Sequence, residues 1–203
     1  MPTIYELKPA FQRLLRPIVR SFAQRGVTPN QVTLTALVLS LAVGVLLSVF
    51  PRCVAVLILV PGMLFLRMAL NAIDGMLARE HDMKSLQGAV LNELGDVISD
   101  AGLYFPFALI PGLSPLLVVS IVTAGIVGEM TGVVIASLGG SRRYDGPLGK
   151  SDRAFAFGLI AVLISIDIAP ISWLNVLLAV LVPLSLLTIA NRARMGLQEI
   201  ETR

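Results

Sequence analysis

Six long apolar runs constrain what this 203-residue sequence can fold into more than any other feature. A helix that crosses a bilayer needs about 17 to 25 predominantly apolar residues, and the runs have about this length. Only 14% of the residues are charged, compared with about a quarter in a soluble domain. We therefore predict an all-α, polytopic membrane protein with six transmembrane helices, at Thr33–Phe50, Val54–Leu77, Gly88–Ile110, Leu116–Leu138, Ala154–Ile168 and Trp173–Ala190.

The basic residues predict the orientation of these spans. Fourteen of the sixteen Lys and Arg residues lie before the first span, between spans two and three, between spans four and five, or after the sixth. Because cytoplasmic loops carry an excess of Lys and Arg, we expect both termini and both charged loops on the cytoplasmic side of an inner membrane. Basic residues beside membrane spans favour anionic lipid as a partner over nucleic acid.

Residues 1–28 have the pattern of an amphipathic helix, with apolar residues at helical spacing and basic residues on the other side. This pattern is typical of a helix in the membrane interface, and we expect it on the cytoplasmic surface. Pro9 and Pro17 favour a bend or an early end of that helix. Its role is open between anchoring the bundle and delivering substrate. We expect residues 29–195 to form the membrane domain and residues 196–203 a cytoplasmic tail.

Ionisable side chains inside the spans need a partner or a function, because each costs at least about 2.5 to 3.5 kcal/mol in hydrocarbon. Polar residues share one face of the second span and one face of the third: Arg67, Asn71 and Asp74, then Asn92, Asp96, Ser99 and Asp100. The loop between these spans is short, so the two helices are adjacent and their polar faces can meet. A single His and a single Cys exclude the usual zinc sites and an intramolecular disulfide. Oxygen ligands of this kind predict a site for Mg²⁺ or Mn²⁺.

These polar residues follow a fixed spacing, Asn71-x-x-Asp74-Gly75-x-x-Ala78-Arg79, then eight residues, then Gly88-x-x-x-Asn92-x-x-x-Asp96. The pattern resembles the signature of the CDP-alcohol phosphotransferase family, D-x-x-D-G-x-x-A-R-(x8)-G-x-x-x-D-x-x-x-D. All spacings agree, and all fixed positions agree except two. The Thr28-Pro29-Asn30-Gln31-Val32-Thr33 element at the first span is also similar to the family. Within the family, the chain resembles YnbA-like bacterial members.

The resemblance implies an integral-membrane transferase of phospholipid biosynthesis, which commonly forms homodimers. In this family an acceptor alcohol attacks the β-phosphate of a CDP-linked lipid, usually CDP-diacylglycerol, and CMP leaves. Asp96 is implied as the catalytic base on the acceptor hydroxyl. The implied metal ligands are Asn71, Asp74, Asn92 and Asp96. The implied CDP-binding residues are Asn30, Thr33, Asp74, Gly75, Ala78, Arg79 and Gly88.

The two departures from the signature are Asn71 and Asn92, which replace the first and third aspartates. A carboxamide can offer its oxygen to a metal ion but brings no charge. We therefore expect one Mg²⁺ or Mn²⁺ ion, with two as the alternative. Arg67 either supplies positive charge to the diphosphate in place of a second ion or pairs with a carboxylate. Asp100 is a candidate auxiliary carboxylate that would restore charge.

The loop between spans four and five is rich in glycine and basic residues. Its Gly149-Lys150-x-x-Arg153 is similar to a family element that holds a phosphate of the lipid or the acceptor. The candidate phosphate- or acceptor-binding residues are Arg67, Arg142, Arg143, Lys150 and Arg153. The alternative is that the loop only signals topology. Glu129, inside the fourth span, either pairs with Arg67 or a loop cation, or contacts the acceptor.

Two other functions remain open beside an active transferase. The two asparagines keep open a catalytically impaired accessory subunit that binds the CDP-lipid. Charged residues inside spans also occur in transporters. However, the charges gather toward one side of the membrane and no inverted repeat is visible, so transport is less favoured.

Overall fold

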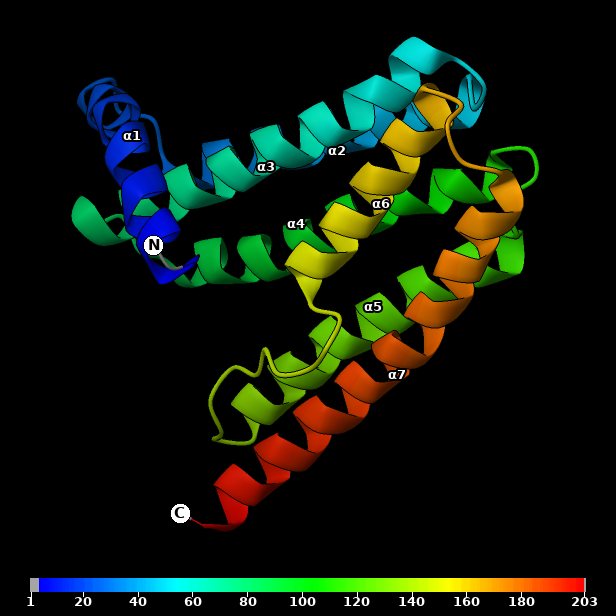
Figure 1. Ribbon diagram of the computed structural model, residues 1–203. Coiled ribbons are helices and arrows are strands. Elements are labelled where there is room, and N and C mark those ends of the chain that lie inside the picture. The colour runs from blue at the N-terminus through cyan, green and yellow to red at the C-terminus, as the bar shows by residue number, and fades with distance from the viewer. Residues whose placement is uncertain (1–3, 203) are drawn as a thin grey trace. The chain divides into compact units, whose positions relative to one another are not determined.

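The computed structural model describes residues 4–202, and this part of the chain is helical without any strand (Figure 1). The elements in order are α1 (Ile4–Gln24), α2 (Pro29–Val49), α3 (Val54–Glu80), α4 (Leu86–Tyr104), the 3-10 helix η1 (Phe105–Leu109), α5 (Pro115–Ser137), α6 (Lys150–Ser165) and α7 (Ile171–Glu201). The predicted all-α fold class is confirmed.

A helix occupies each of the six segments that we predict as spans, and the differences lie at the helix ends. The third segment is divided, because α4 ends at Tyr104 and Pro106 lies at the start of η1, where it lacks the N–H that an α-helix would need. α7 extends to Glu201, so the segment assigned to the tail begins inside this helix. α1 continues past both of its prolines to Gln24.

Four helices in the described part of the chain are long and apolar enough to cross a membrane: α2, α3, α5 and α7. The protein is therefore a membrane protein by composition and helix length. α4 departs from this pattern because it carries Glu93, Asp96 and Asp100. α6 departs from it because it has only 16 residues. Pro61 in α3 and Pro183 in α7 are tolerated inside their helices, as prolines in membrane helices often are.

The start of α2 is fixed by a reciprocal capping box. The hydroxyl of Thr28 accepts a hydrogen bond from the amide of Gln31 at 3.3 Å. The side-chain oxygen of Gln31 accepts one from the amide of Thr28 at 2.9 Å. Pro29 occupies the first helical position, where its missing N–H costs nothing. This cap sets the register of α2 and thereby the position of Thr33, one turn further on.

The chain forms two compact units. The first unit consists of Met1–Ala42 and Gly62–Ser99, and the second unit consists of Val43–Pro61 and Asp100–Arg203. α2, α3 and α4 each contribute one segment to each unit. The aspartates of the signature belong to the first unit, and the basic loop before α6 belongs to the second.

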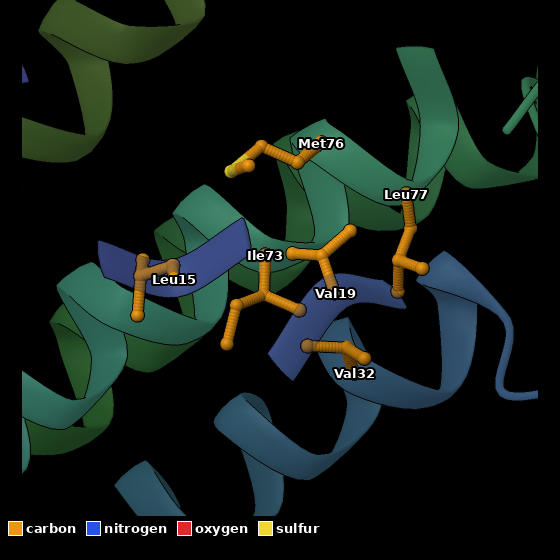
Figure 2. Packing of buried hydrophobic residues seen from close by; sticks show 6 residues of the cluster. All are labelled: Leu15, Val19, Val32, Ile73, Met76 and Leu77. Atoms are coloured by element: carbon orange, nitrogen blue, oxygen red, sulfur yellow. The ribbon is translucent and has the colours of Figure 1, made fainter. Parts of the chain in front are cut away.

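The core of the first unit joins α1 to α2 and α3 (Figure 2). Leu15 and Val19 of α1 pack against Ile73, Met76 and Leu77 of α3, with Val32 of α2 completing the cluster. One side of α1 is therefore covered by protein. Its neighbouring apolar residues Leu14 and Ile18 are exposed.

In the second unit, α5 and α7 lie alongside each other (Figure 1). The ring of Phe157 on α6 stacks on Tyr104 with 4.3 Å between ring centroids and meets Phe107 edge-to-face at 5.0 Å. A Cβ atom at Gly44 would collide with the carbonyl of Gly102. α2 and α4 therefore approach each other closely in this unit, as small residues allow in membrane proteins.

Candidate active site

Asp74 is buried near the end of α3, in the first unit. Its Oδ2 accepts a hydrogen bond from the hydroxyl of Thr33 on α2 at 2.9 Å. A buried carboxylate needs such a donor because the bilayer and the protein interior supply no water. The capping box of α2 and the packing of α1 against α3 hold the two side chains in this register.

Asp96 on α4 is held by two side chains of α3. Arg67 Nη2 donates to the main-chain carbonyl of Asp96 at 2.8 Å and lies 3.3 Å from its Oδ1. Asn71 Nδ2 donates to the same Oδ1 at 3.0 Å. Arg67 and Asn71 are four residues apart and therefore share one face of α3. The predicted meeting of the polar faces of these two helices is thus present.

Small residues of the signature allow close approaches around these carboxylates. A Cβ atom at Gly88 would lie 2.7 Å from the side-chain oxygen of Asn30, so only glycine lets the start of α4 meet the start of α2. The Arg79 guanidinium lies over Gly75, where a Cβ atom would be 3.1 Å from its Nη2. Arg79 itself is exposed. This leaves a cation at the end of α3, four residues beyond a glycine that gives it space.

The oxygen donors of this site fit one hard divalent cation better than two. Asp74 and Asp96 provide the carboxylates, and Asn71 and Asn92 provide carboxamides. The described residues contain no group of three or more His, Cys, Asp or Glu that could hold a metal ion. Mg²⁺ and Mn²⁺ accept carboxylate and carbonyl oxygens. The donor chemistry therefore suits one such ion, but the negative charge is low for two.

Glu129 on α5 is the centre of an arginine cluster in the second unit. Its carboxylate lies 3.0 Å from Arg142, 3.1 Å from Arg153 and 3.3 Å from Arg192. Arg153 also reaches Asp100 at 3.3 Å. Three guanidiniums and two carboxylates leave one net positive charge in this cluster.

A row of buried glycines on α5 makes room for these guanidiniums. A Cβ atom at Gly125 would lie 3.0 Å from Nε of Arg153, and one at Gly132 would overlap the Arg142 guanidinium. Arg192 donates to the main-chain carbonyl of Gly128 at 2.7 Å. Because the three glycines lie at i, i+3 and i+7, they share one helix face with Glu129. The face of α5 is therefore shaped to receive arginine side chains.

The loop before α6 is tied down by its own charges and by α7. Arg143 forms ion pairs with Asp145 at 2.7 Å and with Glu199 at 3.1 Å. The hydrogen bond to Asp145 raises the pKa of Arg143, so its guanidinium is charged at every working pH. Ser141 also donates to Glu199, and the amide of Leu148 donates to the Thr188 hydroxyl at 3.0 Å. Lys150, at the first position of α6, is half-buried.

The predicted residues are thus divided between the two units. Arg67, Asn71 and Asp96 are in contact in the first unit, and Arg142, Arg153 and Glu129 form one group in the second. Arg67 pairs with a carboxylate, which is one of the two roles that the sequence leaves open. Glu129 pairs with loop cations. Asn92 lies one turn before Asp96 on α4, and Asp100 contacts Arg153.

Sequence reasoning missed one member of these groups, Arg192. Its side chain is 1% exposed, although the sequence places it among residues that only flank the last span. The signal that could have found it is the glycine row at 125, 128 and 132, which predicts that large side chains approach α5 from neighbouring helices.

A helical membrane protein with this signature on two adjacent helices is a phosphotransferase that uses CDP-linked alcohols. The sequence model of the CDP-alcohol phosphatidyltransferase family matches residues 26–190. The chain belongs to this family. The resemblance read from the signature residues, and the transferase class that it implies, are confirmed.

Among individual proteins, the chain is similar to the inner membrane protein YnbA of Escherichia coli, with 45% identity over 192 residues and 95% of each chain covered. It is also similar to archaetidylinositol phosphate synthase of Pyrococcus horikoshii, with 31% identity over 104 residues, which cover 51% of this chain and 53% of that protein.

The fold is that of phosphatidylinositol phosphate synthase from Mycobacterium tuberculosis. The crystal structure of that enzyme with CDP-DAG bound has a TM-score of 0.77 at 21% identity, covering 94% of each chain. Its complex with manganese and citrate has a TM-score of 0.74 at 21% identity, covering 89% of this chain and 87% of that chain.

Proposed function

We propose that this chain transfers the phosphatidyl group of CDP-diacylglycerol to an acceptor alcohol and releases CMP. The observation that carries the proposal is the placement of Asp74 and Asp96 at the signature spacing, on contacting helices of one unit, with both carboxylates held by hydrogen bonds. The mycobacterial synthase with the same fold binds CDP-DAG, which supports this donor.

Asp96 acts as the base in this proposal. The acceptor oxygen forms a bond to the β-phosphorus, and the bond from that phosphorus to the bridging oxygen breaks, so that CMP leaves with the electron pair. The hydroxyl proton passes to the Asp96 carboxylate. Arg67 and Asn71 hold that carboxylate in one orientation, as a base needs to be placed within hydrogen-bond reach of the proton that it takes.

The CDP-binding residues are the signature positions around the start of α2 and the end of α3, with Gly88 on α4. Asn30 and Gly88 are in contact, and Thr33 holds Asp74. Gly75 and Ala78 allow close approach to α3, and the Arg79 guanidinium supplies a cation for a phosphate.

The metal ligands are Asp74 and Asp96, with carboxamide oxygens from Asn71 or Asn92. A divalent ion supplies charge neutralisation on the diphosphate oxygens when it is bound. Manganese in the mycobacterial synthase supports a divalent ion. Mg²⁺ and Mn²⁺ both suit these oxygen donors.

The arginine cluster of the second unit binds an anionic group of the lipid or the acceptor. Its net positive charge supports this role, and Arg142 and Arg153 contribute to it. Arg143 in the loop and Lys150 at the start of α6 are further cations for the same anionic group. Asp100 and Glu129 act as auxiliary carboxylates that pair with these guanidiniums and fix their positions. Guanidinium groups recognise phosphate through paired N–H donors.

In the membrane, α2 to α7 form six spans, with both termini and the site on the cytoplasmic side of the inner membrane. The distribution of basic residues supports this orientation. α1 lies in the interface, where exposed Leu14 and Ile18 reach lipid and exposed Arg13 and Arg20 reach headgroups. The active form is a homodimer, as the family resemblance implies.

A second candidate function is an accessory subunit that binds CDP-lipid without turning it over. The observation that favours it is the loss of two signature carboxylates at Asn71 and Asn92. The retained Asp74 and Asp96 favour the active transferase.

The deciding experiment measures CMP release by the purified chain in lipid nanodiscs. CDP-diacylglycerol and Mn²⁺ are supplied with a pool of alcohols and alcohol phosphates. Loss of a general base lowers rates by about 10²- to 10⁴-fold, so Asp96→Asn should abolish most of the CMP. Asp82→Asn is the matched control, because it removes an exposed carboxylate at a backbone φ of 53°, which asparagine tolerates. CDP-lipid binding without CMP release from the unaltered chain would support the accessory subunit instead.

A further inference from the structure

Arg67 is an arginine in the interior of α3, between the apolar first half of this helix and its polar end. It is 4% exposed and lies on α3, one of the helices long enough to cross a membrane. Burying a guanidinium is costly unless it is paired and hydrogen-bonded. Its Nη2 contacts both the main-chain carbonyl and the Oδ1 of Asp96. The positive charge is therefore paired with the carboxylate that acts as the base in the proposed function.

The charge balance of the site differs from that of the four-aspartate signature. The first unit has two carboxylates at signature positions, Asp74 and Asp96, and the guanidinium of Arg67 beside one of them. Their net charge is one negative, in contrast to four negative for four aspartates. One divalent cation would bring this site to one net positive charge, whereas two would leave it strongly positive before any substrate arrives. Asn71 and Asn92 are neutral, so they cannot balance the positive charge of either ion.

The contact geometry points the same way as the charge balance. Oδ1 of Asp96 already accepts from Asn71 and lies beside Arg67. Two protein groups therefore compete with any metal ion for this oxygen. A cation that is covalently part of the protein cannot be removed by chelation and needs no free-metal concentration.

We propose that the Arg67 guanidinium is a built-in cation that takes the place of a second divalent ion, so that the site binds one divalent ion per chain. This inference rests on the proposed function for its use of Asp96. Arg67 acts through Asp96 and is therefore a positioning residue. It fixes the carboxylate on α4 and supplies local positive charge, and the single divalent ion works beside it.

The test counts Mn²⁺ bound by the purified full-length chain in nanodiscs, by following the electron paramagnetic resonance signal of free Mn²⁺. Mn²⁺ is titrated alone and then with CDP. The unaltered chain should bind one ion, and the Arg67→Gln/Asn71→Asp/Asn92→Asp variant should bind two. Zero or two ions in the unaltered chain, or one ion in the triple variant, would overturn the proposal.

Single substitutions at Arg67 separate its charge from a purely structural role. Arg67→Gln should bind its one Mn²⁺ about tenfold more tightly, which corresponds to about 1.4 kcal/mol, because a neighbouring like charge is gone. Arg67→Lys keeps the charge and should bind Mn²⁺ like the unaltered chain. Equal affinity in all three proteins would show that Arg67 only supports the fold, and so would refute the proposal. If Arg67→Gln does not give a monodisperse helical protein, an ion count other than one in the unaltered chain or in Arg67→Lys still overturns the proposal.

The same preparations are assayed for CMP release, which separates this inference from the proposed function. If the chain binds one Mn²⁺ ion and Arg67→Gln has the expected effect, but no CMP is released, the proposed transferase activity is refuted and the built-in cation is supported. If CMP is released and the unaltered chain binds two ions, the transferase activity is supported and the proposal of a built-in cation is refuted.

Discussion

Replacing Glu129 by glutamine should destabilise the protein more than the loss of any other single charge in the second unit. The carboxylate faces three guanidiniums at 3.0 to 3.3 Å, and the Glu129 side chain is 11% exposed. Glutamine has nearly the same shape but no charge. The substitution therefore leaves Arg142, Arg153 and Arg192 close together, with Asp100 as the remaining carboxylate beside Arg153.

The size of the effect follows from the burial of the partners. Removing one partner of a buried ion pair costs about 3 to 5 kcal/mol, because the other charge is left uncompensated. For a chain of about this size, 1 kcal/mol changes the melting temperature by about 2 to 4 °C. Glu129→Gln should therefore lower the Tm by roughly 6 to 20 °C.

The assay is thermal unfolding in detergent, followed by the helical circular dichroism signal. Glu201→Gln is the matched control, because Glu201 is exposed at the end of α7 and should change Tm by less than about 2 °C. A Tm of Glu129→Gln within 2 °C of the unaltered chain would refute the reasoning. It would mean that the three arginines are stabilised by lipid or solvent and not by this carboxylate.

Three further predictions concern glycine, the Asp74 contact and the metal ion. Gly132→Ala should lower Tm because its Cβ would overlap the Arg142 guanidinium, whereas Gly62→Ala, with no atom within 4 Å, should raise stability by up to about 1 kcal/mol; a Tm for Gly132→Ala equal to that of Gly62→Ala would contradict this. Thr33→Val removes a hydrogen bond to a buried carboxylate and should lower the rate of CMP release about tenfold, while Thr35→Val, which loses only an exposed bond to its own helix, should match the unaltered chain. Removal of divalent ions by EDTA should stop CMP release, and added Mn²⁺ should restore it; release that persists in EDTA would exclude a metal-dependent reaction.

The membrane helices could be predicted from the sequence because the length of an apolar run limits where a span can form. Each of the six segments is bounded by charged residues, Pro or Gly, and each coincides with a helix. The positions of the helix ends were harder to predict. α7 continues to Glu201 because a helix needs no apolar side chains to persist, and the change to η1 before Pro106 depends on local backbone bonding.

The contacts of the site could be predicted only in part from the sequence. The i, i+4 spacing of Arg67 and Asn71 predicts a common face, and the structure shows that this face meets Asp96. Periodicity could not show that Arg67 pairs with Asp96, because that contact depends on the distance between α3 and α4. The position of Arg192 depended on the packing of α7 against α5, which the spacing of neither helix contains by itself.

The buried arginines also explain how helices with so many apolar residues select their neighbours. Lipid tails are as apolar as leucine, so apolar contact alone gives little preference for one helix pair over another. Arg67 joins α3 to α4, Arg153 joins α6 to α5, and Arg192 joins α7 to α5. Each pair has a single register in which its charges meet, so the ion pairs specify both the partner and the register. Each of these buried arginines therefore stabilises the fold and is also a cation of the kind that could bind a phosphate group. Activity lost on removing such a charge therefore does not identify a catalytic role, whereas a charge-conserving substitution such as Arg67→Lys can separate the two.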